Sequence, residues 1–494
     1  MKNLKQILSS VVCSGLIFAQ AVSAEISTFY KGDFDNNGVI DISDITHMCE
    51  YLCGKGSTPD SITADITGDD RTDIADLVAL RAEAIGQYDM DSEDGKFIDA
   101  PVAKIETSLS SQGEPSLVIF CVEFPDCKYS RDFTAEMVDD IAFGDANEES
   151  EYFPFESMTA FYERSSKGVM HLTGRTFRYT AQNPISYYTD DLDLLAYECF
   201  KFFEDSVDFK KYDTDDDGVI DASLFAVPES ADENYWWPYS IPFSTDNCRI
   251  DGLKIGHMIT GNVAPYDVVN FNSSYLHEMG HCMGIPDYYL YYSEDDYEGM
   301  NGNAGPELMD ADAFSDFGAF SKLMLGWYRK EQINVFEKSM KKAVYKLHDA
   351  QSENGNCIII PHGKPDKNYF SEYMIIEYIT ENGNNSVLNT LSWQSMKPGI
   401  RIMHIKADFV KGPWWNYFKY ENGSEETGYD DEGIRLLRLV NDGKDPFDSG
   451  DIVDSSVSGF GWYDVYGNET LDVGVKVHIG EIEDDCYTIT VSCE

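Results

Sequence analysis

The stretch Tyr275-Leu-His277-Glu278-Met-Gly-His281-Cys-Met-Gly284-Ile-Pro-Asp287 carries the most specific pattern in this chain. On a helix, residues four positions apart lie on one face, so His277 and His281 can each direct a ring nitrogen at one metal ion. Glu278 follows directly, close enough to act on a water at that metal while staying outside the coordination shell. Gly284 can end the helix in a left-handed conformation, which lets the chain turn back and present Asp287. The spacing predicts a catalytic zinc site with three protein ligands and one open position.

Each of these residues also has a purely structural interpretation. Ordinary residue frequencies give a chance HExxH in a chain of this length odds of roughly 1%. Under the structural interpretation, His277 and His281 are hydrogen-bonded helix residues, and Asp287 is a cap or turn residue. A later Asp or Glu could also replace Asp287 as the third ligand. The rarity of the pattern nevertheless favours zinc.

The predicted site suits hydrolysis of a peptide bond. Zinc lowers the pKa of its bound water and polarises the substrate carbonyl. Glu278 would accept the proton of that water and pass it to the leaving amine, as a general base and then a general acid. Two alternatives stay open: an inactive, peptidase-like binding or structural component, and a zinc hydrolase that acts on an ester or a carbohydrate.

The HExxHxxGxxD pattern resembles that of the immune inhibitor A-type metallopeptidases, secreted bacterial zinc endopeptidases related to the metzincins. The resemblance covers about residues 115–410. It implies a metzincin-like catalytic domain in which Met309, or less favourably Met300, lies under the zinc. The other similar stretches are Tyr162–Gly168 with His171–Gly174, Tyr212–Asp221, Tyr235–Tyr239, and Glu307–Asp310 followed by Phe320–Trp327.

A duplicated acidic pattern lies near the N-terminus. In each copy, side chains at loop positions 1, 3, 5, 9 and 12 can converge on one calcium ion, and position 7 offers its backbone carbonyl. Gly38 supplies the sharp turn of the first loop, whereas Asp70 stands there in the second, so we expect the second site to be weaker. The predicted ligands are Asp33, Asp35, Asn37, Asp41 and Asp44 in the first copy, and Asp65, Thr67, Asp69, Asp73 and Asp76 in the second.

Each calcium loop is followed by apolar residues at helical spacing, and two such units in tandem resemble a dockerin module. The resemblance spans residues 25–92 and implies a cohesin domain of a scaffold protein as partner. A calcium-stabilised spacer without a partner is the alternative. Ile42-Ser43 and Ile74-Ala75 stand where some dockerins carry a hydroxyl pair that contacts cohesin, so the cohesin type stays open. The module also occupies the place where the peptidase family usually carries a propeptide.

A third acidic loop lies inside the predicted catalytic domain. Asp213, Asp215, Asp217 and Asp221 alternate at loop positions 1, 3, 5 and 9, with a glycine at position 6. These spacings predict one further calcium ion, with a bracing rather than a chemical role. The alternative is an acidic surface turn.

Composition limits the partners of the 494-residue chain. Its 88 Asp and Glu outnumber 37 Lys and Arg, for a net charge of -51, which excludes nucleic acid and disfavours anionic membranes. Residues 1–24 are typical of a signal peptide: Lys2 and Lys5 precede an apolar stretch that is too short for a membrane span, and Ala24 offers a cleavage site. We therefore expect secretion, and local disulfides such as Cys121–Cys127 or Cys486–Cys493 are open possibilities.

These patterns predict a multidomain chain. A small all-α calcium-loop module over 25–92 follows the signal peptide, and a linker covers 93–115. An α/β (α+β) catalytic domain covers 116–330 and opens with the apolar run Leu117–Phe120, which we expect to be a buried strand. Residues 331–494 alternate short β-rich runs with turns and predict a β-sandwich-like C-terminal domain.

Overall fold

The computed structural model describes residues 42–53, 55, 72, 74, 76–77, 80, 96–105, 107–189, 191–245, 248–289, 305–310, 314–364, 366–391, 397–412, 416–422, 434–441 and 445–494. The chain divides into two compact units, residues 1–95 and 96–494, and each is considered by itself. Within the described ranges, no helix combines the length and the apolar character that crossing a bilayer requires.

The N-terminal unit contains helix α2 (Ile42–Leu52). Met48 is buried on this helix, and Asp76 and Leu80 of the second copy are also buried. The predicted signal peptide, residues 1–24, lies outside the described residues. The side chain of Asp44 is not described either. Most of the other predicted calcium ligands of this unit also lie outside the described residues: Asp33, Asp35, Asn37, Asp41, Asp65, Thr67, Asp69 and Asp73.

The second unit begins with a five-stranded sheet in the order β2-β1-β3-β5-β4. The first four strands are parallel, and β4 is antiparallel to β5 at the edge. The predicted buried strand over Leu117–Phe120 is confirmed, because β1 is buried along almost its whole length, as expected of a parallel strand covered on both faces. The strands are β1 (Ser116–Glu123), β2 (Thr173–Thr180), β3 (Val219–Ala226), β4 (Tyr239–Pro242) and β5 (Lys254–Gly261).

Alternation along β1 divides the core into two layers. Leu117 and Ile119 point to the layer that contains α9, whereas Val118 and Phe120 point to the layer that contains α7. The helices are α5 (Ala135–Phe143), α6 (Met158–Ser166), α7 (Leu192–Phe203), α8 (Glu233–Trp236), α9 (Val268–Cys282) and α10 (Ala319–Met324), with short 3-10 turns at Pro101–Lys104, Ile185–Tyr187 and Phe209–Tyr212.

Residues 331–494 are rich in strands, as predicted. One sheet has the order β13-β10-β9-β8-β6 and another the order β14-β17-β18-β7, and apolar side chains of both meet in one shared core. The strands are β6 (Ile333–Val335), β7 (Lys342–His348), β8 (Cys357–Pro361), β9 (Glu372–Ile379), β10 (Gly399–Lys406), β13 (Leu437–Leu439), β14 (Ile452–Val453), β17 (Val475–Glu483) and β18 (Cys486–Cys493), and two hairpins pair β11 (Phe409–Lys411) with β12 (Asn416–Phe418) and β15 (Gly461–Tyr463) with β16 (Glu469–Asp472).

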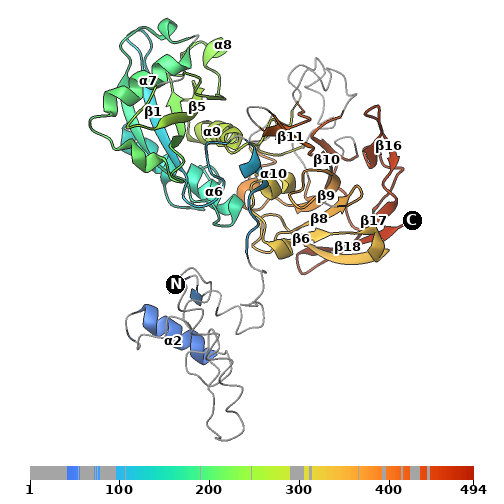
Figure 1. Ribbon diagram of the computed structural model, residues 1–494. Coiled ribbons are helices and arrows are strands. Elements are labelled where there is room, and N and C mark those ends of the chain that lie inside the picture. The colour runs from blue at the N-terminus through green and yellow to red at the C-terminus, as the bar shows by residue number, and fades with distance from the viewer. Residues whose placement is uncertain are drawn as a thin grey trace, which may run out of the picture. The chain divides into compact units, whose positions relative to one another are not determined.

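The sheets of 116–330 and of 331–494 form two lobes, and α9 lies on the side of the first lobe that faces the second (Figure 1). One apolar core contains residues of both lobes, among them Met279 of α9 and Ile375 of β9. The hydrophobic core is therefore continuous across the predicted domain boundary at 330/331. The chain is a mixed α/β, sheet-rich protein of several parts.

Residues 96–115, predicted as a linker, pack against the rest of this unit. The backbone amides of Ser108 and Leu109 both donate to the Cys282 carbonyl at the end of α9, at 3.2 and 3.3 Å. The indole of Trp327 donates to the Ser111 carbonyl at 2.7 Å. The segment thus covers the end of the helix that carries the predicted ligands.

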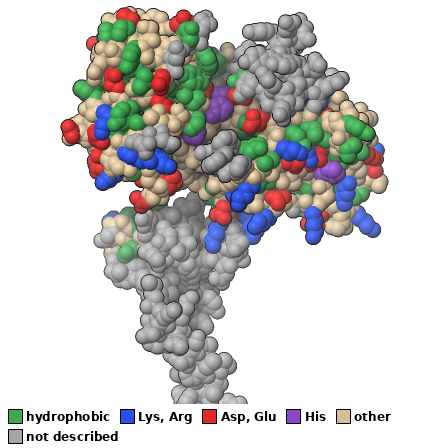
Figure 2. Space-filling view, turned by 45° about the horizontal axis from the view of Figure 1, so that its top comes forward, with side chains coloured by type: hydrophobic (Ala, Val, Ile, Leu, Met, Phe, Trp, Pro, Cys, Tyr) green, Lys and Arg blue, Asp and Glu red, His purple; other side chains and the backbone are tan. Residues whose placement is uncertain are grey.

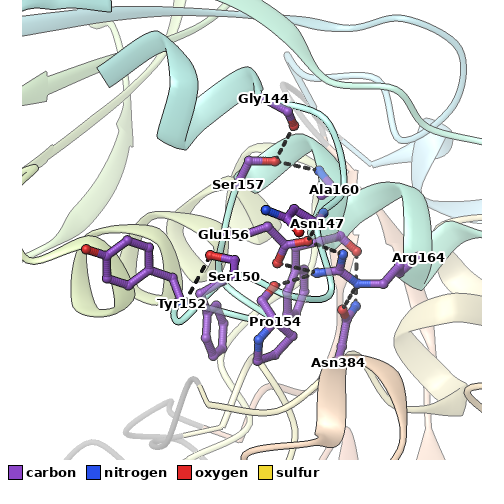
Figure 3. Close-up of polar contacts among 12 residues, drawn as sticks. Gly144, Asn147, Ser150, Tyr152, Pro154, Glu156, Ser157, Ala160, Arg164 and Asn384 are labelled. Atoms are coloured by element: carbon purple, nitrogen blue, oxygen red, sulfur yellow. Dashed lines mark hydrogen bonds and ion pairs between the residues drawn. The ribbon is translucent and has the colours of Figure 1, made fainter. Parts of the chain in front are cut away.

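A buried polar cluster around Arg164 joins the two lobes (Figure 3). From α6, the Arg164 guanidinium donates to both carboxylate oxygens of Glu156, at 2.5 and 3.0 Å, and to the Pro154 carbonyl. It also donates at 2.8 Å to the side-chain oxygen of Asn384, which lies in the short 3-10 turn Gly383–Asn385 of the second lobe. The similar segment noted in the sequence, Tyr162–Gly168, therefore serves at least in part to hold the lobes together.

All ten described cysteines are free thiols, including the two local pairs that the sequence left open. The part of the chain that the structure describes holds no disulfide.

Candidate metal centre

Helix α9 ends where the sequence predicts. Gly284 adopts a left-handed conformation with φ of 91°, and its amide donates to the His281 carbonyl at 2.9 Å. A side chain on Gly284 would also press against Thr107, with a Cβ 2.8 Å from the threonine methyl. Beyond this turn the chain runs back towards the helix, which places Asp287 opposite the two histidines.

The three predicted ligands converge. The Nε2 atoms of His277 and His281 lie 3.0 and 3.3 Å from the same oxygen, Oδ1 of Asp287. The three donor atoms all lie within 4.8 Å of one another. His277 and Asp287 are buried, and His281 is partly exposed.

Both imidazoles have their second nitrogen fixed by a backbone carbonyl. Nδ1 of His277 donates to the Leu308 carbonyl at 2.7 Å, and Nδ1 of His281 donates to the Ile285 carbonyl at 2.8 Å. A metal-binding histidine is usually held in this way, because the bond fixes the tautomer and the ring orientation. Two Nε2 lone pairs and a carboxylate oxygen that face one another need a cation or protons between them. This donor set fits zinc.

Without a metal ion, the pKa values of His277 and Asp287 show that positive charge between these side chains is favourable. Burial lowers the pKa of His277, but the hydrogen bond to Asp287 and the charges of Glu278 and Asp287 outweigh it and raise the pKa to about 9. Burial raises the pKa of Asp287, but the two histidines outweigh it and hold the pKa far below the usual range. The carboxylate is thus ionised and ready to bind a cation.

Glu278 lies in the wall of a cavity beside the ligands. The carboxylate is buried, and burial raises its pKa above the usual value although both histidines oppose the shift. The cavity has a volume of about 460 Å³ and is lined by Trp237, Pro238, Tyr239, Ser240, Glu278, His281, Pro286, Asp287 and Tyr289. Histidine side chains are visible at the surface beside hydrophobic and acidic ones (Figure 2).

Met309 packs directly under the helix that carries the histidines. It is fully buried, and its sulfur occupies the space beside Gly280 where a side chain would otherwise lie. The preceding Leu308 supplies the carbonyl that holds His277. Met309, the favoured candidate for the position under the zinc, thus packs against the helix that carries His277 and His281, whereas Met300 lies outside the described residues.

The loop at 213–221 brings together three of its four predicted ligands. Carboxylate oxygens of Asp213, Asp215 and Asp221 lie within 4.8 Å of one another. Asp217 does not join this group, and its Oδ1 instead accepts from the Val219 amide at 2.7 Å. Asp221 is buried and also accepts from the Ser116 amide at 2.9 Å, which ties the loop to the start of β1.

Sequence reasoning missed the groups that surround the ligands. The carbonyls of Leu308 and Ile285 carry no side-chain signal that could identify them. The ring of Tyr289 stacks on His277 with centroids 6.3 Å apart. The similar stretch Tyr235–Tyr239, to which the sequence analysis assigned no role, supplies part of the cavity wall.

Comparison with known families identifies one module. A family model, the dockerin type I domain, matches residues 31–83, inside the predicted 25–92. No curated protein matches the chain significantly. The chain therefore carries a dockerin type I domain, a calcium-binding module that tethers its protein to a cohesin-bearing scaffold and is typical of extracellular assemblies.

Proposed function

We propose that the protein is a secreted, zinc-dependent endopeptidase that its dockerin tethers to a cohesin-bearing scaffold. In this proposal residues 116–330 are a metzincin-like catalytic domain of the immune inhibitor A type, and 331–494 are β-sandwich-like. One observation carries the proposal. Two histidine Nε2 atoms and one Asp287 oxygen converge beside the buried carboxylate of Glu278, in the wall of an open cavity.

The residues of the centre suit hydrolysis. When bound, zinc supplies Lewis acidity to a water molecule and to the substrate carbonyl. Burial raises the pKa of Glu278, which favours its uptake of a proton, the role of a general base. The carbonyls of Leu308 and Ile285 keep the two imidazoles in the tautomer that binds metal.

The cavity suits an extended peptide. Its wall contains Tyr239 and Ser240 of β4, which pairs with β5 and is the edge strand of its sheet among the described residues. An edge strand offers free backbone amides and carbonyls, and an extended peptide can pair with them as an additional strand. Such pairing would bring a peptide bond alongside Glu278 without demanding a particular side chain.

We also propose calcium in the loop at 213–221. The converging carboxylates of Asp213, Asp215 and Asp221 would share one ion, which would brace the start of β3 against β1. Its role would be structural.

Replacing Glu278 with Gln tests the proposal. The rate of cleavage of an unstructured protein such as casein should fall by about 10²–10⁴-fold, because a positioned acid–base group contributes that much. The Gln variant should still bind one zinc ion in the unit 96–494. A zinc chelator should abolish cleavage by the wild-type protein. Undiminished cleavage by the Gln variant would contradict the mechanism. A zinc-loaded wild-type chain that cleaves no protein would instead favour the alternative of an inactive scaffold component.

A further inference from the structure

The backbone of the third proposed ligand is not fixed by a helix, whereas the backbone of the two histidines is. His277 and His281 lie on α9, so the backbone of the helix fixes their spacing. Asp287 lies beyond the end of the helix, in a segment without regular secondary structure. Its position therefore depends on contacts that hold the neighbouring backbone.

Both polar backbone groups of the next residue, Tyr288, are held. Its amide donates to the Met309 carbonyl at 2.9 Å. Its carbonyl accepts from Nδ2 of Asn422 at 2.8 Å, and Asn422 belongs to the second lobe. The peptide between Asp287 and Tyr288 is thus held by Met309, and the peptide that follows Tyr288 is held by Asn422.

Asn422 is itself fixed by a strand. Its Nδ2 also donates to the Leu437 carbonyl at 2.7 Å, and its Oδ1 accepts from the Leu437 amide at 3.1 Å. The side chain is fully buried, and both of its donor hydrogens are used. Leu437 begins β13, which pairs with β10, so the position of Asn422 is set by the large sheet of the second lobe.

A second link from the same sheet reaches the segment under the histidines. Arg401 of β10 donates to the Pro306 carbonyl at 2.7 Å and pairs with Glu377 of β9 at 2.6 Å. The Pro306 carbonyl lies two residues before Leu308, whose own carbonyl orients His277. The sheet that contains β10 and β13 thus contacts the chain next to Asp287 and the segment whose Leu308 carbonyl orients His277.

We propose that the sheet of the second lobe is part of the metal centre and that Asn422 is a positioning residue for Asp287. The inference rests on the proposed function, because it treats Asp287 as a zinc ligand. An asparagine suits the position since it donates twice to carbonyls and accepts once from an amide. Neither an apolar side chain nor a carboxylate can do so.

The test compares Asn422→Ala with a matched control, Asn356→Ala. Asn356 is also buried and bridges a strand in the same manner, donating to the Lys346 carbonyl at 2.9 Å and accepting from the His348 amide at 2.8 Å. It does not contact the ligand segment. Zinc affinity is measured by competition with a chelator in the full-length chain, together with the visible spectrum of the cobalt-substituted protein.

Asn422→Ala should weaken zinc binding by about 10–100-fold, the usual effect of removing a group that orients a ligand. The cobalt spectrum should change with it. Asn356→Ala should lose thermal stability but keep both zinc affinity and spectrum. Equal zinc affinities in the two variants would overturn the proposal. If Asn422→Ala does not fold, Asn422→Asp keeps the shape and the acceptor but removes the donors, and the same comparison applies.

Failure of this inference can be distinguished from failure of the proposed function. A wild-type chain that binds zinc but cleaves no peptide would refute only the peptidase assignment, and the zinc affinities would still test Asn422. A wild-type chain with no zinc affinity would overturn both.

Discussion

At the scale of single residues, the absence of a side chain at Gly280 shapes the candidate metal centre. A Cβ there would overlap the sulfur of Met309, which is fully buried against the helix. Met309 in turn follows Leu308, whose carbonyl orients His277. Close packing at this glycine is thus coupled to the orientation of a ligand one turn away.

Replacing Gly280 with Ala should therefore disturb the centre, although alanine favours helices by about 1 kcal/mol. Overpacking against Met309 should cost about 1–3 kcal/mol of the free energy of unfolding and weaken zinc binding. Adding Met309→Ala should restore part of the loss, because it removes the overlapping sulfur. Chemical denaturation and chelator competition on the two single variants and the double variant measure this coupling. Strictly additive effects would refute it.

The residues that sequence could predict are those whose geometry is local. Helical spacing alone relates His277, Glu278 and His281, and Gly284 predicts the turn that returns Asp287. The contacts that fix these ligands arise from distant segments: Leu308 lies 31 residues from His277, and Asn422 lies 134 residues from Tyr288. No local pattern marks such partners, because a backbone carbonyl or a lone asparagine looks the same in any loop.

At the scale of elements, strands β9 and β10 carry a buried ionic network outside the metal centre. His404 of β10 is almost fully buried and lies between Glu372 of β9, at 3.0 Å, and Glu469 of β16, at 2.6 Å. Burial lowers the pKa of His404, but its two carboxylate partners outweigh it and raise the pKa above 6.5. The pKa of Glu372 is lowered to about 2, because hydrogen bonds from His404 and His362 outweigh the effect of burial.

The signs of these shifts predict how a variant should behave with pH. The raised pKa of His404 contributes stability that is complete below pH 6.5 and is lost as pH rises through the folded-state value. The lowered pKa of Glu372 contributes stability above pH 4.5 that is lost as pH falls towards 2. His404→Gln should lower the free energy of unfolding by about 3–5 kcal/mol between pH 4.5 and pH 6.5, and by less at alkaline pH. Urea denaturation at several pH values tests this against His478→Gln, an exposed control; a pH-independent loss would contradict it.

The loop between Tyr212 and β3 offers a matched test of calcium binding. Saturating calcium should stabilise the fold, by about 2.7 kcal/mol at 100 times the dissociation constant. Asp215→Asn should abolish the calcium-dependent rise in unfolding temperature of this unit, since Asp215 is one of the three converging carboxylates. Asp216→Asn should keep it, because Asp216 is exposed, lies outside that group, and has a φ of 59° that asparagine tolerates. Equal calcium effects in both variants would mean that the loop is only an acidic turn.

Helices and strands could be predicted from the sequence where a local property, such as an apolar run, determines them. The apolar run in β1 predicted a buried strand, and the strand-rich end of the chain is as expected. The linker predicted over 93–115 instead packs against the rest of its unit over the described part, 96–115. Its packing depends on amides that bind the Cys282 carbonyl, and local composition does not show such long-range backbone bonds.

At the scale of the whole molecule, the chain separates the two tasks proposed for it. Residues 96–494 contain the candidate metal centre, and the dockerin lies in the other compact unit. A net charge of -51 favours solubility and disfavours association with other acidic surfaces. In the proposed function, the dockerin therefore localises the protein by specific, calcium-dependent binding rather than by charge. Tethering acts through effective concentration and needs no contact with the active site.

Disabling the dockerin should therefore change location without changing chemistry. Asp33→Ala combined with Asp65→Ala removes the first predicted ligand of each calcium loop and should abolish calcium-dependent binding to a cohesin. The kcat/KM for a soluble peptide should stay within about twofold of wild type, since the proposed ligands His277, His281 and Asp287 lie in the other unit. Cleavage of a protein fixed to the same scaffold should fall by about 10²-fold or more, because the effective concentration is lost. Surface binding to an immobilised cohesin and paired rate measurements check this. A parallel loss of soluble-peptide cleavage would show that the dockerin unit contributes to the active site, and the proposed separation of tasks would be wrong.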